Sequence, residues 1–342
     1  MAASILPAEA ASSPGVWRLA WRRLRGDRVA MVSLAVVAGF LVLVLASAAG
    51  FVSADWAREV AVPYANPGFL GATVGDAARI ERPDTPRIDI SAVDPLASRY
   101  AEWDARAAQL KQETVQLKDT LPFGGDRLGR DVLLKAVKGA QVSILIGLSA
   151  ALLAVVIGTV LGGAAGYFGG PAGDLLEWLY NVFTAVPGIL LIFAFAAVLG
   201  RGTSTVVLIL ALTGWTGVYR LVRAEYLKHR VREYVRAAEA IGASHASRLF
   251  VHILPNVSHV VLVQLSLLVV AFIKSEVILS FLGLGVPIDS VSWGTMLNEA
   301  QSELILGKWW QLAAATAFMA VFVTAFSMLT DALRDALDPR LR

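Results

Sequence analysis

Long apolar runs constrain the fold of this 342-residue chain more than any other feature of its sequence. A helix needs about 20 predominantly apolar residues to cross a bilayer. Runs of this kind cover 29–54, 140–168, 176–199, 203–218, 257–282 and 310–329. Only 17% of the residues are charged, whereas soluble domains average about a quarter. The sequence therefore predicts an all-α polytopic membrane protein with six transmembrane helices.

The first run follows a basic segment, WRLAWRRLRGDR, at 17–28. A signal peptide has an apolar core of only about 7–15 residues. The longer run 29–54 is therefore predicted to be a retained anchor, with the N-terminus in the cytoplasm. Trp17 and Trp21 are four positions apart, which favours a short interfacial helix within the segment 1–28. A disordered basic tail is the alternative.

Six spans that start from the cytoplasm also place the C-terminus there. The loop between the fourth and fifth spans would then be cytoplasmic. Between 219 and 259 the sequence has seven Lys/Arg and three acidic residues, in agreement with the positive-inside bias. We therefore predict an external loop at 55–138 and a five-helix core at 139–342, which includes a cytoplasmic loop at 219–256.

Small residues and proline mark two of the predicted spans. Gly158, Gly162 and Gly166 are each four positions apart, which favours the close approach of another helix in the membrane. A hinge in a pore is the alternative. Pro187-Gly188 predicts a kink in the third span.

The second half of the external loop has helical periodicity. Apolar residues recur on one predicted face at Leu96, Tyr100, Trp103, Ala107, Leu110 and Leu117. Asp94-Pro95 is a plausible start for this helix. We predict an amphipathic helix of about six turns, which serves either as a lid on the outer membrane face or as a docking site for an external partner.

Several kinds of chemistry are not indicated. The chain has no cysteine, and it lacks the phosphate-loop, Gly-x-Ser-x-Gly and His-Glu-x-x-His patterns. The four histidines are His229, His245, His252 and His259. The last three are seven positions apart, but Gly242 and Pro255 are predicted to interrupt a helix that would align them. We therefore expect no metal site and no catalytic residue.

The cytoplasmic loop contains the stretch EYVRAAEAIGASHASRLFVHILPN at 233–256. Alanines precede Gly242 at the distance of a helix C-cap, and a second short helix is predicted after it. Pro255 is expected to end that helix and to start the fifth span in a new direction. The product would be a small rigid body that another protein can grip and move.

This stretch resembles the signature loop of the permease subunits of bacterial ABC importers. The pattern here is Arg236-Ala237-Ala238-x3-Gly242 followed by Leu254-Pro255, with arginine where the family usually has glutamate. Four further segments resemble dipeptide, oligopeptide and nickel permeases in particular. They are PFGGDRLGRDV at 122–132, LSFLGLGVP at 279–287, SWGTML at 292–297 and LRDALDPRLR at 333–342. The resemblance covers roughly 15–55 and 120–342, whereas the insertion at 55–120 is longer than in most members.

The resemblance implies a type I ABC importer permease fold in the bacterial inner membrane. It implies four kinds of partner: a second homologous permease, two cytoplasmic ATPases, an external substrate-binding protein and the lipid bilayer. Nucleic acid is not among them. ATP hydrolysis would occur on the separate ATPases, so this chain would be no enzyme and would carry no cofactor. The implied ATPase-coupling residues are Arg236, Ala237, Ala238, Glu239, Gly242, Ala243, Leu254 and Pro255.

Peptides are the substrate class that the resemblance favours. A nickel or other small-solute importer of the same family is one alternative, and an ATP-independent secondary transporter or channel is another. A purely structural membrane anchor is a third, although an anchor would not need the Gly242 and Leu254-Pro255 hairpin.

Two charged residues, Lys274 and Glu276, lie well inside the fifth span. Charges within a membrane are costly and usually face a cavity or a partner. Residues two positions apart point about 200° apart on a helix, so these two are not expected to pair with each other. We predict that both belong to the translocation pathway, with Glu276 meeting the amino end of a peptide. A structural pair with the partner permease is the alternative.

Overall fold

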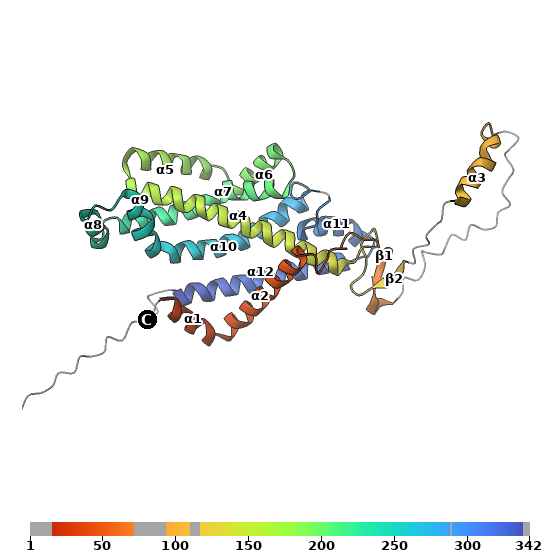
Figure 1. Cartoon of the computed structure of the whole chain (residues 1–342), viewed down its shortest axis with the longest axis horizontal. Helices are drawn as coiled ribbons and strands as arrows, with labels where there is room; N and C mark the ends of the chain where they lie inside the picture. Colours follow the sequence, from red (N-terminus) through yellow and green to blue (C-terminus); the bar gives the residue numbers. More distant parts are fainter. Residues whose placement is uncertain (1–15, 72–93, 110–116, 288, 338–342) are drawn as a thin grey trace, which may run out of the picture. The chain divides into compact units, whose positions relative to one another are not determined.

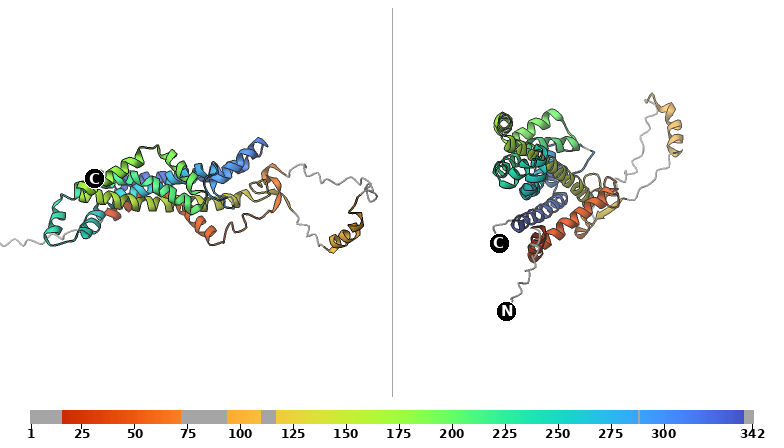
Figure 2. Two further views of the ribbon diagram at one scale, coloured as in Figure 1. Left: turned by 90° about the horizontal axis from the view of Figure 1, so that it is seen from above. Right: turned by 60° about the vertical axis from the view of Figure 1, so that its left-hand side comes forward.

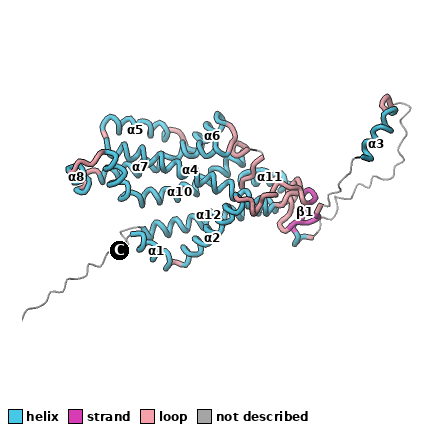
Figure 3. The backbone as a smooth tube through the Cα atoms, in the orientation of Figure 1, coloured by secondary structure: helices cyan, strands magenta, loops and turns pink. Residues whose placement is uncertain are grey.

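A computed structural model describes residues 16–71, 94–109, 117–287 and 289–337. The chain divides into two compact units. The first comprises Met1–Ala54 and Leu134–Arg342, and the second comprises Asp55–Leu133. Helices make up most of the described chain, as Figure 3 shows.

The first unit contains the candidate membrane spans (Figure 1). Among the described residues, five helical segments are long and apolar enough to cross a membrane, and a bent helix pair makes six if it counts as one span. The longer helices of this unit are α2 (Arg28–Ala48), α4 (Val132–Phe168), α5 (Gly170–Thr184), α6 (Gly188–Leu199), α7 (Thr203–His229), α10 (Leu254–Phe281), α11 (Trp293–Ile305) and α12 (Trp310–Leu337). Five of the six predicted spans are therefore present as single helical segments, and the predicted third span corresponds to the bent pair of α5 and α6.

Two helices at the N-terminal end pack beside α12. Helix α1 (Val16–Gly26) is the short helix that the sequence predicts in this segment, and Asp27 caps α2 by accepting from Val29 N at 2.8 Å. Helix α2 ends at Ala48, earlier than the predicted residue 54, because the chain turns through Gly50 at φ +79°. Its Phe40 ring lies 5.2 Å from that of Phe322 in α12.

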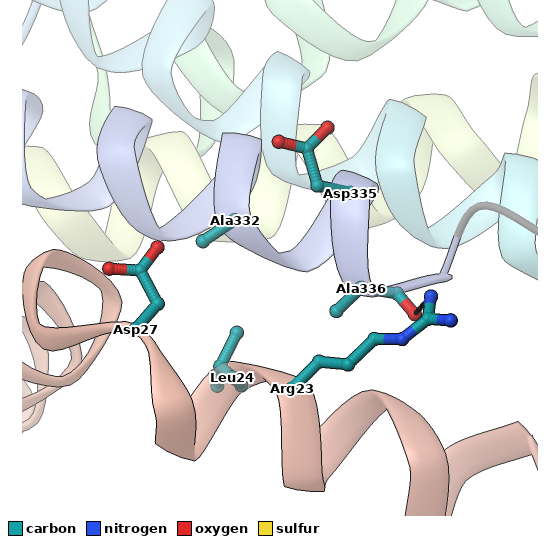
Figure 4. A pocket seen from close by; sticks show the side chains of 6 residues that line it. All are labelled: Arg23, Leu24, Asp27, Ala332, Asp335 and Ala336. Carbon is teal, nitrogen blue, oxygen red and sulfur yellow. Dashed lines mark hydrogen bonds between the residues drawn. The ribbon is translucent and has the colours of Figure 1, made fainter. Parts of the chain in front are cut away.

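A pocket of about 310 Å³ lies between α1 and the end of α12 (Figure 4). Leu24 of α1 is buried in this contact. The guanidinium of Arg23 donates to the carbonyl of Ala336 at 3.5 Å. Asp27, Ala332 and Asp335 complete the lining. These contacts fix α1 against the last turns of α12.

The three predicted packing glycines lie on the face of α4 that contacts α7. A Cβ on Gly162 would meet the carbonyl oxygen of Tyr219 at 2.6 Å. A Cβ on Gly166 would meet the Arg223 carbonyl oxygen at 2.6 Å, and one on Gly158 would meet Val218 Cβ at the same distance. The two backbones are in direct contact, so the close-packing interpretation is confirmed.

The third span is broken at the predicted proline. Helices α5 and α6 meet at an angle of 85°, with Pro187 immediately before the first residue of α6. Proline lacks an amide hydrogen and clashes with the preceding turn, so a helix cannot run through it unchanged. The kink is confirmed in position, although the change of direction is far larger than a simple kink.

The fifth span starts earlier than predicted. Helix α9 (His245–Ser247) continues through a π-helical segment, η3 (Arg248–Ile253), into α10. Residues His245–Phe281 therefore form one helical segment of 37 residues. The predicted change of direction at Pro255 is wrong. Proline has no amide hydrogen, so it usually costs a helix one backbone hydrogen bond. Here Pro255 follows a π-helical turn, in which the standard hydrogen-bond pattern is already interrupted, so the helix continues through it. Three other spans also exceed their apolar runs: α4 starts at Val132, α7 reaches His229, and α12 reaches Leu337.

The second unit contains a small parallel sheet, which the all-α prediction did not include. Strand β1 (Ala61–Pro67) pairs with β2 (Lys118–Leu121), and a short 3-10 helix, η1 (Gly68–Leu70), follows β1. Gly129 adopts φ +71°, and a Cβ there would overlap the carbonyl oxygen of Ala61. Only glycine permits this close contact of the two backbones.

The same unit contains part of the predicted amphipathic helix. A short 3-10 helix, η2 (Ala97–Arg99), leads into α3 (Tyr100–Gln109). Asp94 stands at the predicted start. Hydrogen bonds from the Tyr100 hydroxyl and the Leu96 amide lower the pKa of its carboxyl group. Leu117 is not helical and directly precedes β2, so the six-turn helix is wrong at that end, while residues 110–116 lie outside the described part.

Candidate functional site

Between α7 and α10 the predicted cytoplasmic loop forms a compact body, at one end of the helices in Figures 1 and 2. Helix α8 (Glu233–Ala240) contains the alanines of the stretch. It ends in a Schellman motif: the Gly242 amide donates to Glu239 O at 2.9 Å, and the Ala243 amide donates to Ala238 O at 3.0 Å. Gly242 adopts φ +86°, a left-handed conformation that favours glycine. The predicted C-cap glycine is confirmed.

Ser244 then caps the second helix of the loop. Its hydroxyl accepts from the Ser247 amide at 3.2 Å. Because the helix continues from α9 through η3 into α10, His245, His252 and His259 share one helical segment, contrary to the predicted interruption. Within the described residues no group of three or more His, Asp and Glu side chains is placed to hold a metal ion.

Arg248 joins the two halves of this body. It is 8% exposed, and its Nη1 lies 2.6 Å from the Glu239 carboxylate in α8. Its Nη2 donates to His245 Nδ1 at 3.0 Å, and its guanidinium lies 5.7 Å from the ring centroid of Tyr167 at the end of α4. The Tyr167 hydroxyl is 3.0 Å from the same histidine nitrogen. One buried arginine thus connects α8, α9 and α4.

An apolar core lies beneath the loop and connects it to the spans. The buried side chains of this core are Val155, Val218, Val222, Tyr226, Val235, Leu249, Ile253 and Val257. Within it, the Tyr226 hydroxyl donates to the carbonyl of Leu249 at 3.1 Å. Leu254 packs against the same core, whereas Pro255 is exposed. The loop is therefore continuous with the packing of α4, α7 and α10.

A basic cleft of about 880 Å³ lies where α7 turns into α8. It is lined by Lys228, Val231, Arg232, Glu233 and Tyr234. The hydroxyl of Tyr234 is 2.8 Å from His229 Nδ1. Burial raises the pKa of Tyr234 above its ordinary value of 10.0.

The outward side of α8 and the turn after it has no cover from the described chain. Arg236, Ala237 and Gly242 are exposed, and Ile241 is 85% exposed. A Cβ on Gly242 would have nothing within 4 Å. Ala238 is buried on the inward side. An exposed isoleucine between small residues on a rigid turn is a surface suited to contact with another protein.

The structure brings together the predicted residues of the motif and adds two that sequence reasoning missed. The two short helices lie against each other, with Leu254 at the core that Val235 also joins. Arg248 was counted only as one basic charge of the loop. Its pairing with Glu239 depends on the reversal at Gly242. No sequence pattern distinguishes Ile241 from an apolar residue of the core.

The two membrane charges occupy opposite environments, as their spacing predicts. Glu276 is fully buried, and its carboxylate accepts from the Ser280 hydroxyl at 2.7 Å. The other carboxylate oxygen is buried without a hydrogen-bond partner among the described residues. Lys274 is exposed on the other side of α10. Glu276 therefore faces no open space in this structure, and its predicted role in the pathway stays a prediction.

A second polar cluster connects α4, α11 and α12. The ammonium of Lys135 is 2.5 Å from the Glu299 carboxylate and 3.2 Å from the Gln311 amide oxygen. The Gln311 amide nitrogen donates to the same Glu299 carboxylate at 3.1 Å. Lys135 and Gln311 are buried. This cluster holds α11, which the apolar runs did not predict, against two spanning helices.

Comparison with known proteins places most of this chain in one family. Residues 143–342 match the family described as binding-protein-dependent transport system inner membrane component. Residues 15–66 match the N-terminal TM domain of oligopeptide transport permease C.

Individual relatives agree with these matches. The dipeptide transport system permease protein DppC of Bacillus subtilis (strain 168) is 38% identical over 220 residues, which are 64% of this chain and 69% of the relative. The oligopeptide transport system permease protein OppC of the same strain is also 38% identical over 220 residues, 64% of this chain and 72% of the relative. The dipeptide transport system permease protein DppC of Lactococcus lactis subsp. cremoris (strain MG1363) is 30% identical over 321 residues, 94% of this chain and 90% of the relative.

Proposed function

The chain belongs to the family of binding-protein-dependent transport system inner membrane components, and from this premise we propose that it forms half of the pathway of an ATP-driven peptide importer. It is a multi-pass inner membrane protein. Members of the family work with ATPases and with a substrate-binding protein. Peptides are proposed as the substrate because the relatives DppC and OppC are named for dipeptide and oligopeptide transport.

The loop between α7 and α10 is the proposed joint with the ATPases. The observation that carries this proposal is the single helical segment His245–Phe281, which runs from the loop into the fifth span. Arg248 holds α8 onto the start of that segment. A force applied to the exposed surface at Arg236, Ala237 and Ile241 would therefore move α10 as a lever. Coupling of this kind needs a two-state body that both sites bias.

The proposed assignment of ATP hydrolysis to other subunits rests on the family. ATP hydrolysis is proposed to occur on two cytoplasmic ATPase subunits, and this chain would need no cofactor of its own. A second, homologous permease would complete the pathway. Both termini and the loop would face the cytoplasm, in line with the seven Lys/Arg against three acidic residues between 219 and 259.

Reconstitution tests the proposal directly. The chain is purified with its ATPases, second permease and binding protein and placed in proteoliposomes, and uptake of a labelled tripeptide is measured with ATP, with ADP and without the binding protein. We expect uptake only with ATP and the binding protein together. Uptake by the chain alone, driven by an ion gradient, would support the secondary-transporter alternative.

The same vesicles distinguish the alternative within the family. Labelled Ni²⁺ replaces the peptide under identical conditions. ATP-dependent uptake of Ni²⁺ without uptake of peptide would overturn the proposed substrate while leaving the coupling proposal intact.

A further inference from the structure

Lys274 is a charged side chain inside a membrane-spanning helix for which the described chain provides no partner. It is exposed, and among the described residues no carboxylate lies within ion-pair distance of it. It precedes Phe281, the last residue of α10, by seven positions, a depth of about 10 Å along the helix. A lysine inside a membrane is energetically costly when it faces lipid, so such residues usually face water or an opposite charge.

The other sides of α10 at this level are covered. Phe272 packs against Gly214 of α7, where a Cβ would overlap its ring. Ile273 packs against Gly147 of α4, where a Cβ would overlap its side chain. Val277 packs against Gly294 of α11, where a Cβ would lie 2.6 Å from the Val277 carbonyl oxygen. Lys274 therefore points to the side that α4, α7 and α11 leave open.

Neighbours on the same side form a continuous exposed stripe. Leu267, Ala271, Lys274, Ile278 and Leu282 are three or four positions apart and share one helix face. All five are exposed, for example Ile278 at 43% and Leu282 at 53%. Ala271, one turn before Lys274, has the smallest side chain of the stripe.

Glu276, the other ionisable residue in this part of α10, lies in a different environment from Lys274. Glu276 is fully buried, and its carboxylate accepts from the Ser280 hydroxyl within the same helix. Lys274 has no comparable enclosure. It also lies on the helical segment that continues from the proposed coupling loop, so movement of that loop would change its position.

We propose that Lys274 lines the translocation pathway of the assembled importer and binds the carboxylate at the C-terminal end of a transported peptide. This inference rests on the proposed function. It assigns to Lys274 the contact with the substrate and leaves Glu276 as a group buried within the packing of α10. A cation that meets an anion inside a narrow pathway interacts more strongly than it would in bulk water, because the surroundings are less polar.

The first test uses the absence of cysteine from the natural chain. Lys274→Cys, Ile278→Cys and Val42→Cys are each assembled with the partner subunits in proteoliposomes and treated with a negatively charged, membrane-impermeant thiosulfonate during ATP turnover. Val42 lies on α2, an apolar span without an intramembrane charge, and is 65% exposed, so it provides a control with an exposed side chain on another span. We expect the thiols introduced by Lys274→Cys and Ile278→Cys to react at least tenfold faster than the thiol introduced by Val42→Cys. Equal, slow reaction of all three variants would overturn the pathway assignment.

The second test addresses the carboxylate. Uptake of a tripeptide is compared with uptake of the same tripeptide carrying a C-terminal amide, for the wild type, Lys274→Gln and Lys274→Arg. We expect Lys274→Gln to lower the ratio of free-acid to amide uptake about tenfold, and Lys274→Arg to retain most of it. An unchanged ratio would refute carboxylate binding. Failure of Lys274→Gln to co-purify with the second permease would instead identify a structural pair between subunits and would also overturn the proposal.

Failure of the proposed function itself gives a different result. The wild-type assembly would then show no ATP-dependent peptide uptake, while the thiol reactivity of the Lys274→Cys variant would still report whether this side of α10 is in contact with water.

Discussion

Replacing Gly162 with alanine is expected to force α4 and α7 apart. The new Cβ would lie 2.6 Å from the carbonyl oxygen of Tyr219, about 0.8 Å closer than the 3.4 Å at which ordinary contact begins. It would also lie 3.1 Å from Tyr219 Cα. Both atoms belong to the backbone, so no side-chain rotation can relieve the overlap. The helices must separate along their contact.

The size of the effect follows from two opposing terms. Overpacking a tight contact costs about 1–3 kcal/mol. Alanine is favoured over glycine in a helix by about 1 kcal/mol, which offsets part of that cost. Gly217, in α7, provides the matched control because a Cβ there would meet nothing within 4 Å. Gly217→Ala should therefore gain the helix propensity of alanine without any cost of overpacking.

The assay is thermal loss of helical circular dichroism of the purified chain in one detergent, for the wild type and both variants. Gly162→Ala should lower the midpoint, and Gly217→Ala should leave it unchanged or raise it. A difference of about 1–3 kcal/mol between the two variants is expected. Equal midpoints for the two alanine variants would refute the argument that the backbones touch at Gly162.

Two further predictions concern buried charges. Glu299→Gln removes the carboxylate that pairs with the ammonium of Lys135 and should lower the free energy of unfolding by about 3 kcal/mol. Adding Lys135→Met to this variant should restore most of the loss, measured as thermal midpoints. No recovery in the double variant would contradict the ion-pair account. Arg248→Met removes the link between α8 and the start of α10 and should increase hydrogen exchange across α8 at least tenfold, measured by mass spectrometry. Glu239→Gln, at an exposed partner, should change that exchange far less, and equal effects would contradict the assignment of Arg248 as the central contact.

Much of the fold could be predicted from the sequence because lipid imposes simple rules. Apolar length determined where α2, α4, α7, α10 and α12 cross, although several of these helices extend beyond or stop short of their apolar runs. Four-residue glycine spacing predicted the α4–α7 contact, which depends only on small size. The glycine at the end of α8 was predictable because a left-handed C-cap is a local requirement.

Other features depend on contacts between distant segments and gave no local signal. The 85° bend between α5 and α6 needs more than Pro187, because a proline in a membrane helix often causes only a modest kink. The continuity of α9, η3 and α10 depends on the π-helical segment η3, which lets the helix run on through Pro255. The parallel sheet pairs β1 with β2, two short strands that lie far apart in the sequence.

The candidate site shows the same division. The motif from Arg236 to Pro255 identified the loop, but its exposed and buried sides became clear only with the turn at Gly242 in place. Spacing placed Lys274 and Glu276 on different sides of one helix. It could not decide which side the other helices cover, because that depends on α4, α7 and α11 together.

The central claim is that the loop between α7 and α10 couples this chain to ATP hydrolysis on its partners. A charge placed at Ile241 tests that claim most directly. Ile241 is 85% exposed, so Ile241→Asp should leave the fold unchanged while placing a charge on the surface proposed to contact an ATPase. ATP hydrolysis stimulated by the binding protein is measured in proteoliposomes containing the complete importer. The account predicts at least a tenfold loss of stimulated hydrolysis and of peptide uptake, with an unchanged thermal midpoint of the purified chain. Full stimulation and full uptake by the Ile241→Asp importer would contradict it.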